Sequence, residues 1–254
     1  MSTRASAGAR RGLVETAAAA VDVLFPPVCV HCRGLVETTS AGLRYVCAAC
    51  SPGIEMVRAP HCITCGHPFY GEVEGERMCP HCEGLLPAFA EGRTATLFTG
   101  PVRALVIELK YHRGLHVLRD METIASRNAD FVAFLRDAVL VPVPLHARKL
   151  RERSYNQAQL LAECFARVAG GSTRVEKLLD RRLDTETQTA FDRQTRRQNL
   201  KNAFALAENA ALNPALSYII VDDVFTTGST VNSCAHVLRR AGLVNLRVAT
   251  FGHG

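Results

Sequence analysis

The sequence of 254 residues contains no tryptophan and few aromatic residues of any kind, 6% in all. It also lacks any run of about 18 apolar residues, so it predicts no membrane-spanning helix. Arginines near the start would suit a signal peptide, but Glu15 and Asp22 interrupt the part that would have to be apolar. We therefore expect a cytoplasmic protein in which residues 1–24 form a tail and an amphipathic helix.

Signatures of several common enzyme classes are also missing. No strand end carries the G-x-x-x-x-G-K-[ST] loop that binds nucleoside triphosphates or the G-x-G-x-x-G loop that binds dinucleotides. No Ser/His/Asp or Cys/His set stands out, so the sequence indicates no covalent nucleophile. The net charge of +6 is compatible with phosphate-rich partners but does not identify one.

Cysteines, by contrast, are concentrated in four C-x-x-C pairs within one third of the chain. Without an export signal we expect a reducing compartment, where clustered cysteines indicate metal rather than disulfides. Two residues between thiolates is the spacing that places both sulfurs on one tetrahedral Zn²⁺. The simplest arrangement is two structural zinc ribbons in series, although interleaved pairing of the first pair with the third also fits the spacing. The serial ligand sets are Cys29, Cys32, Cys47 and Cys50, then Cys62, Cys65, Cys79 and Cys82.

Other interpretations of these cysteines are less favoured. A redox C-x-x-C normally opens the helix of a βαβ unit, and none of the four pairs does. His31, His61 and His81 each neighbour a cysteine and could replace one as a ligand, but we expect them on the surface. The remaining Cys164 and Cys234 fall on helix faces and are expected in the core. Since the cysteine-rich segment has few large apolar residues, zinc should supply most of its folding free energy.

The most informative stretch runs from residue 218 to residue 230. Its apolar start (218–221) predicts a buried parallel strand, followed by the acids Asp222 and Asp223 and then by helical apolar spacing from Val231. Free N–H groups at such a helix start face an anion, so the turn predicts a phosphate site. The acids suit a ribose diol and Mg²⁺. The alternative is an ordinary turn whose acids cap the helix. The predicted phosphate ligands are Thr226, Thr227, Gly228, Ser229 and Thr230.

Further strands and helices alternate along the rest of the chain. Strands are predicted at 92–98, 138–143, 175–179, 203–206 and 246–251, and helices at 100–113 and 115–135. Ser154 is expected to cap a helix whose buried face includes Leu161 and Phe165. This order predicts a mostly parallel sheet flanked by helices on both sides.

Two basic segments follow predicted strands. Residues 145–153 form a basic turn that could be a solvated surface, but its position after a strand favours contact with a pyrophosphate. Residues 181–199 are polar and arginine-rich and predict a mobile loop, either a lid or disordered, that leads into a short helix.

Taken together, these motifs resemble the ComF family of competence-associated phosphoribosyltransferase-like proteins, including relatives linked to gluconate use. The resemblance runs from about residue 25 to residue 252. One departure is Ser154, where the family has glycine, so the pyrophosphate loop should differ slightly. The stretches that carry the resemblance are the C-x-x-C pairs, 141–146 running into 153–158, Gln188 with Arg193, Arg197, Asn199 and Phe204, and 220–230.

The resemblance implies an α/β fold of the type I phosphoribosyltransferase class, with a double zinc-ribbon module at 25–88 and the transferase-like domain at 89–254. Asp222 and Asp223 would hold the ribose hydroxyls and Mg²⁺, and residues 226–230 would bind the 5′-phosphate of phosphoribosyl pyrophosphate. The pyrophosphate would meet Arg148, Arg151 and Arg153, while a lid carrying Arg193 and Arg197 closes over it. Asp222, Asp223 and Arg153 are thus the expected catalytic residues.

The implied activity is pentosyl transfer to an acceptor that the sequence does not identify, in the process of DNA uptake. An alternative is a non-catalytic protein of the DNA-uptake machinery that binds single-stranded DNA through the same ribose-phosphate site. With so few aromatic residues, such binding should be mainly electrostatic. A purely structural zinc adaptor would leave the acid pair and hydroxyl turn without a purpose.

Overall fold

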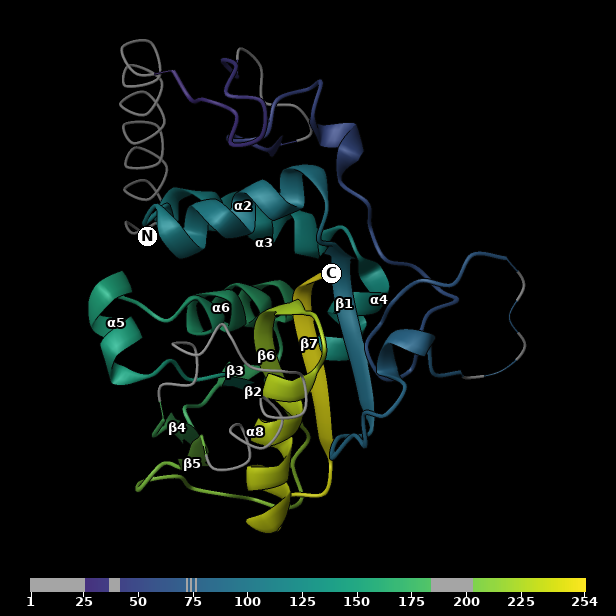
Figure 1. Ribbon diagram of the computed structural model, residues 1–254, viewed down its shortest axis with the longest axis vertical. Coiled ribbons are helices and arrows are strands. Elements are labelled where there is room, and N and C mark those ends of the chain that lie inside the picture. Colours follow the sequence, from purple (N-terminus) through teal and green to yellow (C-terminus); the bar gives the residue numbers. More distant parts are fainter. Residues whose placement is uncertain (1–25, 37–41, 72, 74, 76, 184–202) are drawn as a thin grey trace, which may run out of the picture.

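The computed structural model describes residues 26–36, 42–71, 73, 75, 77–183 and 203–254, and its centre is a five-stranded sheet (Figure 1). The strand order is β1-β7-β6-β2-β3, and every pairing in this sheet is parallel. The prediction of a mostly parallel α/β sheet is therefore confirmed. Its strands are β1 (Glu91–Leu97), β2 (Val139–Pro142), β3 (Arg174–Val175), β6 (Tyr218–Phe225) and β7 (Leu246–His253).

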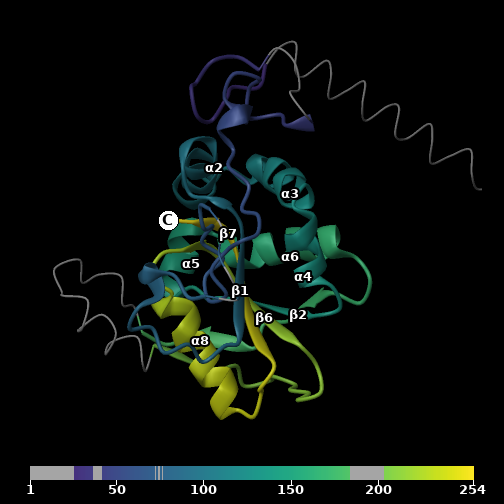
Figure 2. The ribbon, with the colours of Figure 1, turned by 90° about the vertical axis from the view of Figure 1, so that its right-hand side faces the viewer.

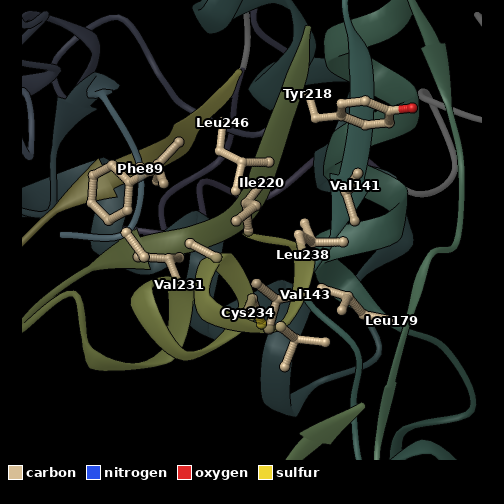
Figure 3. Close-up of a cluster of buried hydrophobic side chains, with 14 of the residues drawn as sticks. Phe89, Val141, Val143, Leu179, Tyr218, Ile220, Val231, Cys234, Leu238 and Leu246 are labelled. Carbon is tan, nitrogen blue, oxygen red and sulfur yellow. The ribbon is translucent and has the colours of Figure 1, made fainter. Parts of the chain in front are cut away.

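Both faces of the sheet are buried, because successive residues of β2, β6 and β7 enter different core clusters. Ile220 and Val141 join one cluster with helix α8 (Figure 3), whereas Ile219 and Leu140 join the other. Figure 2 shows α8 on one side of the sheet and α4 and α6 on the other. The helices are α2 (Gly100–Tyr111), α3 (Leu118–Ser126), α4 (Ala129–Leu135), α5 (Ala147–Arg153), α6 (Gln157–Ala169) and α8 (Ser229–Arg240). None of the helices in these ranges has the length and apolar character needed to cross a bilayer.

The strand order places a topological switch point between β2 and β6. From β2 the chain continues to β3 on one side, and from β6 it continues to β7 on the other side. The loops that leave the carboxyl ends of these two neighbouring strands therefore diverge, and open α/β sheets bind their ligands beyond such a point. Both sequence segments predicted to bind phosphate, at 145–153 and 226–230, begin there.

The predicted helix at 115–135 is wrong in one respect, because it is divided into α3 and α4. Asn128 interrupts the helix between α3 and α4. Its Oδ1 accepts a hydrogen bond from the N–H of Phe131 and caps α4. Its Nδ2 donates to the carbonyls of Val57 and Ala95 at 2.8 and 3.1 Å. The side chain thus serves distant backbone, which helical periodicity does not reveal.

The strand predictions at 175–179 and 203–206 also need correction. Only Arg174–Val175 joins the main sheet, and the chain then leaves it to form β4 (Leu179–Arg181). Segment 203–206 contains β5 (Phe204–Leu206), which pairs antiparallel with β4 in a separate two-stranded sheet. Burial of Leu179 and Phe204 against the α8 cluster explains why these segments are apolar although they lie outside the main sheet.

Ser154 does not cap the following helix, as predicted, but ends the preceding one. The basic segment forms α5, begun by His146, whose Nδ1 accepts from the N–H of Arg148. Ser154 follows it in the left-handed conformation (φ 73°), a backbone that glycine adopts with less strain. Asn156 is the residue that caps α6. The predicted face of α6 is buried: Ala158, Leu161, Ala162 and Phe165.

The two cysteine-rich segments pack in different places: the first lies over α2 and α3 (Figures 1 and 2), and the second joins the α8 side of the sheet. Val30, Leu43 and Val46 of the first belong to the cluster of α2, α3, α4 and α6, whereas the second joins the α8 cluster. The first segment is held by Asp120 of α3, whose carboxylate accepts the backbone N–H groups of Arg44 and Tyr45 at 2.9 and 2.7 Å. Asp120 itself is fully buried.

Changing Asp120→Asn should weaken this attachment, because an amide nitrogen cannot accept either N–H. We expect the free energy of unfolding to fall by about 1–3 kcal/mol, the cost of one buried unsatisfied donor. Urea denaturation measures it. The control is Glu122→Gln on the same helix, which alters the contacts of Glu122 with half-exposed Arg167 and with Cys164 and should cost less than about 1 kcal/mol. Equal losses in the two variants would contradict the special role of Asp120.

Candidate functional site

Strand β6 is longer than predicted, so the two acids lie within it rather than in the turn. Asp222 pairs in register with Thr250 of β7, and the strand continues to Phe225. Asp222 is half-buried and Asp223 is only 3% exposed. Alternation along the strand gives the two carboxylates different neighbours, on the α8 face for Asp222 and on the α2 face for Asp223.

Lys110, in the last turn of α2, is the counter-charge of Asp223. Its Nζ lies 2.7 Å from Asp223 Oδ1, and both side chains are largely buried. Burial opposes the charged form of Lys110, but the charges of Asp223 and Asp222 outweigh it and raise the lysine pKa. The sequence analysis missed Lys110 as a site residue. The only available signal was indirect: a buried acid requires a cation, and a helix end is a favourable place for one.

One oxygen of Asp223 has no hydrogen-bond partner in the described part of the chain. Among the described residues, Oδ2 is buried and receives no hydrogen bond, although Oδ1 is paired with Lys110. A buried carboxylate oxygen in this state favours an external partner such as a hydroxyl group or a hard cation. The carboxylates therefore fit the predicted ribose and Mg²⁺ contacts chemically.

Asp222 has an unusually high affinity for its proton. Burial first, and then the charge of Asp223, raise the pKa of Asp222 to about 7, whereas Lys110 and Arg181 act in the opposite direction. Arg181 lies in β4, at the start of the predicted lid, so this end of the lid is near enough to act on the acid. Arg193 and Arg197 fall outside the described residues.

The predicted phosphate ligands gather at the start of α8. Gly228 precedes the helix at φ 69°, and a Cβ atom there would lie 2.5 Å from Phe225 Cζ, so both conformation and space require glycine. The first-turn N–H groups have no intrahelical acceptors, and only a long contact of 3.4 Å joins Ser229 N–H to Thr227 Oγ1. Thr226 and Thr227 are exposed beside them. The loop therefore offers N–H and hydroxyl donors together at a positive helix end.

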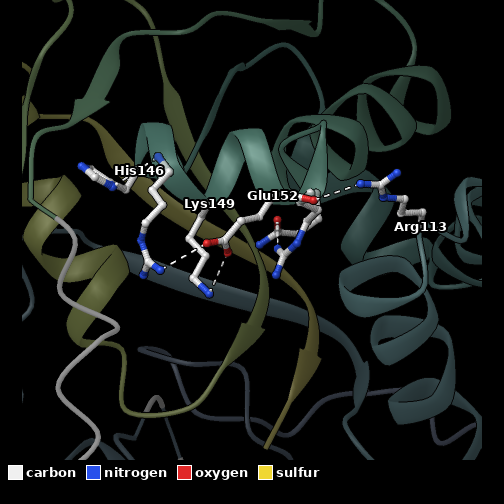
Figure 4. A network of polar contacts seen from close by, with 7 residues as sticks. Arg113, His146, Lys149 and Glu152 are labelled. Atoms are coloured by element: carbon white, nitrogen blue, oxygen red, sulfur yellow. Dashed lines mark hydrogen bonds and ion pairs between the residues drawn. The ribbon is translucent and has the colours of Figure 1, made fainter.

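Helix α5 contributes cations on more than one face. Arg148 and Lys149 both pair with Glu152 (Figure 4), at 3.2 and 3.4 Å. Arg153, about 140° around the helix from Arg148, instead donates to Gln157 and lies over the ring of Tyr111. The structure thus does not bring the three predicted arginines onto one surface, since Arg153 faces the end of α2.

Hydrogen bonds fasten this region to the end of α2. The Tyr155 hydroxyl donates to the carbonyl of Leu109, and Arg113 donates to the carbonyl of Glu152 at 3.3 Å (Figure 4). Leu109 immediately precedes Lys110. The end of α2 therefore both anchors the loop after β2 and carries the counter-charge of Asp223. The contributions of Tyr111 and Arg113 were not anticipated from the sequence.

The eight paired cysteines form two separate sets, and the pairing is serial as first proposed. In each set the four sulfurs lie within 4.8 Å of one another, and among the described residues no histidine joins either set. Backbone N–H groups approach several of the sulfurs, such as Cys79 N–H to Cys62 Sγ at 3.2 Å, which favours thiolates. Four thiolates at this spacing fit a closed, structural Zn²⁺ site. Cys164 and Cys234 are fully buried core residues, as expected.

The two sets differ in exposure, which predicts different rates of zinc loss. All four cysteines of the second set are buried, whereas Cys32 is exposed and Cys47 and Cys50 are half-buried. We expect two zinc ions per chain, released to a colorimetric chelator in a fast and a slow phase. Cys32→Ser should remove the fast phase alone, and Cys82→Ser the slow phase. Release of both ions in one phase would show that exposure does not control the exchange.

Comparisons with other proteins agree with these features. Residues 20–83 match the family described as the double zinc ribbon domain. The chain is 30% identical over 226 residues to competence protein F of Haemophilus influenzae, covering 87% of this chain and 94% of that protein. It is 29% identical over 229 residues to DNA utilization protein YhgH of Escherichia coli K12, with coverages of 88% and 95%. It is also 26% identical over 205 residues to competence protein ComFC of Bacillus subtilis, with coverages of 78% and 79%. The first similarity extends over nearly the whole of both chains, and the protein therefore belongs to the ComF family.

Proposed function

We propose that this protein binds phosphoribosyl pyrophosphate with Mg²⁺ and transfers the phosphoribosyl group to an acceptor, as part of DNA uptake. The observation that carries the proposal is the position of the acid pair and the Gly228 loop at the switch point between β2 and β6. The process follows from relatives named for competence and for DNA utilization.

In this proposal the 5′-phosphate occupies the loop at 226–230. The free N–H groups of the first turn of α8 and the hydroxyl groups of Thr226 and Thr227 donate to its oxygens. The exposed position of both threonines supports this role. Gly228 keeps the backbone close to the anion, because any side chain there would meet Phe225.

The acids orient the ribose and hold its metal. Asp223 presents Oδ2 while Lys110 holds the other oxygen, so the carboxylate stays in place. Mg²⁺, when bound here, would neutralise charge that develops on the departing pyrophosphate. Asp222 gives a second acceptor for a ribose hydroxyl once its proton is lost.

The cations stabilise the leaving group. Arg148 and Lys149 would exchange Glu152 for pyrophosphate oxygens, and Arg151 is exposed on the same helix. Arg153 supports the site from the side of Tyr111. We assign Arg193 and Arg197 to a lid that excludes water, since water would compete with the acceptor.

A second candidate function is binding of single-stranded DNA without catalysis. Tyr111 supports it, because its ring is 70% exposed and carries Arg153 at 5.7 Å on one side. An exposed aromatic ring beside several cations can stack a base while the cations contact phosphates.

Calorimetry with phosphoribosyl pyrophosphate and Mg²⁺ tests the principal proposal. The wild-type protein should bind, and the double change Asp222→Ala with Asp223→Ala should weaken binding at least about 100-fold, as loss of two charged contacts predicts. The control is Glu208→Ala, an exposed acid before β6 and thus at the other edge of the sheet. No binding by the wild type, or unchanged binding by the double variant, rejects the proposal. Salt-sensitive oligothymidine binding in that case would favour the second candidate.

The pKa of Asp222 predicts how affinity depends on pH. Below pH 7 the carboxyl is protonated, so binding of the magnesium complex should weaken by roughly tenfold per pH unit. Asp222→Asn should remove this part of the dependence, while titration of the ligand affects both proteins alike. In the absence of ligand, the folding stability should change with pH in the opposite direction to the ligand affinity. The folded state binds the extra proton between about pH 4 and 7, so stability should fall as pH rises through that range. Identical pH profiles for both proteins would contradict the assignment.

A further inference from the structure

The second cysteine set belongs to the hydrophobic cluster that lies behind the 226–230 loop. Its four cysteines belong to the same buried cluster as Phe225, the last residue of β6, and Val231 and Ala235 of α8. The segment that follows Cys82 stays attached to it, because Leu85 N–H donates to the carbonyl of Cys82 at 3.0 Å. One backbone turn therefore connects a cysteine of the set to Leu85.

Leu85 forms part of the wall behind the loop. A Cβ atom on Gly228 would lie 3.0 Å from Leu85 Cδ2 and 2.5 Å from Phe225 Cζ, so the glycine backbone rests against both side chains. Interiors packed this closely transmit displacement rather than absorb it. Movement of Leu85 would therefore move the backbone that carries the loop's N–H donors.

Asn232 fastens the first turn of α8 to the same segment. Its Oδ1 accepts the N–H of Ala88 at 2.7 Å, and its Nδ2 donates to the carbonyl of Leu86 at 2.9 Å. Its own N–H donates to the carbonyl of Gly228 at 2.9 Å. Asn232 thus connects residues 86–88 with the loop residue that must be glycine.

Ring contacts with histidines form a second connection between Phe225 and the second cysteine segment. The ring of His253, at the end of β7, stacks on Phe225 with centroids 5.7 Å apart and an interplanar angle of 11°. His253 in turn contacts His67 and His81 of the second cysteine segment, with ring centroids 4.8 and 6.1 Å away. Phe225 is therefore also connected to that segment through His253.

We propose that residues 85–88 of the second cysteine segment position the 226–230 loop for anion binding, with Asn232 as the positioning residue. Zinc bound by all four cysteines of the second set then controls the affinity of the loop for an anion. Zinc in the first set does not affect this affinity. This inference rests on the proposed phosphate site, but the loop's attachment can be measured without any ligand. The first set belongs to the segment that lies over α2 and α3 and joins the other cluster (Figure 2).

The test compares Asn232→Ala with Arg239→Ala. Both remove hydrogen bonds to Ala88, but Arg239 reaches its carbonyl, at 3.1 Å, from the last turn of α8. Amide hydrogen exchange in peptides covering 226–233 should accelerate at least tenfold in Asn232→Ala and stay unchanged in Arg239→Ala. Affinity for phosphoribosyl pyrophosphate with Mg²⁺ should fall at least tenfold in Asn232→Ala alone. Zinc content should remain two per chain in both.

Leu85→Ala supplies an independent variant that leaves every cysteine and the Asn232 hydrogen bonds in place, and it should also accelerate exchange in 226–233. Cys82→Ser should do the same, whereas Cys32→Ser should not. Equal exchange in Asn232→Ala and Arg239→Ala, or acceleration by Cys32→Ser as large as by Cys82→Ser, overturns the inference. If the wild type binds no phosphoribosyl pyrophosphate, the proposed function fails while the exchange data still decide the attachment.

Discussion

The buried charge of Asp223 is the constraint on which the arrangement of the site depends. A carboxylate this far from water is tolerated only beside a cation, and Lys110 supplies it from the end of α2. That requirement fixes where α2 must end. The Tyr155 hydroxyl bond to Leu109 then links the start of α6, and so the loop after β2, to the same helix end. One ion pair thereby relates the loops of two neighbouring strands across the switch point.

The two cysteine sets support this arrangement from two different sides. The first packs through Leu43 and Val46 on the α2 side, and the second packs behind Phe225 on the α8 side. Each segment is too poor in large apolar residues to hold its position by burial alone, so closed thiolate sites supply the rigidity that a larger core would otherwise give. Their separation also explains why the chain carries two sets rather than one.

Much of the fold was predictable from the sequence, because its signals are local. Apolar runs identified β2, β6 and β7, helical spacing identified α2 and α8, and the C-x-x-C spacing identified both cysteine sets, with serial pairing as the simplest choice. Predictions became wrong where one side chain serves distant backbone. Asn128 divides the predicted helix because its amide reaches Val57 and Ala95. Lys110 stayed unassigned because its partner, the side chain of Asp223, lies on another element of the fold. The roles assigned to Arg148, Arg151, Arg153 and the phosphate loop remain predictions.

Burying Asp222 beside Asp223 lowers the stability of the folded state, and other parts of the fold must offset this cost. Burial and the neighbouring charge raise the pKa of Asp222 to about 7, so the ionised form of Asp222 carries an energetic cost near neutral pH. The loop beyond them is also constrained, with Gly228 at a positive φ and in contact with Phe225 and Leu85. Such features persist when the surroundings over-determine them. Here the surroundings are Lys110 on one face of the sheet and the closed second cysteine set on the other. Binding of a cation and a phosphate would lower the free-energy cost that Lys110 and the second cysteine set offset. This is the physical reason to expect a ligand at this place.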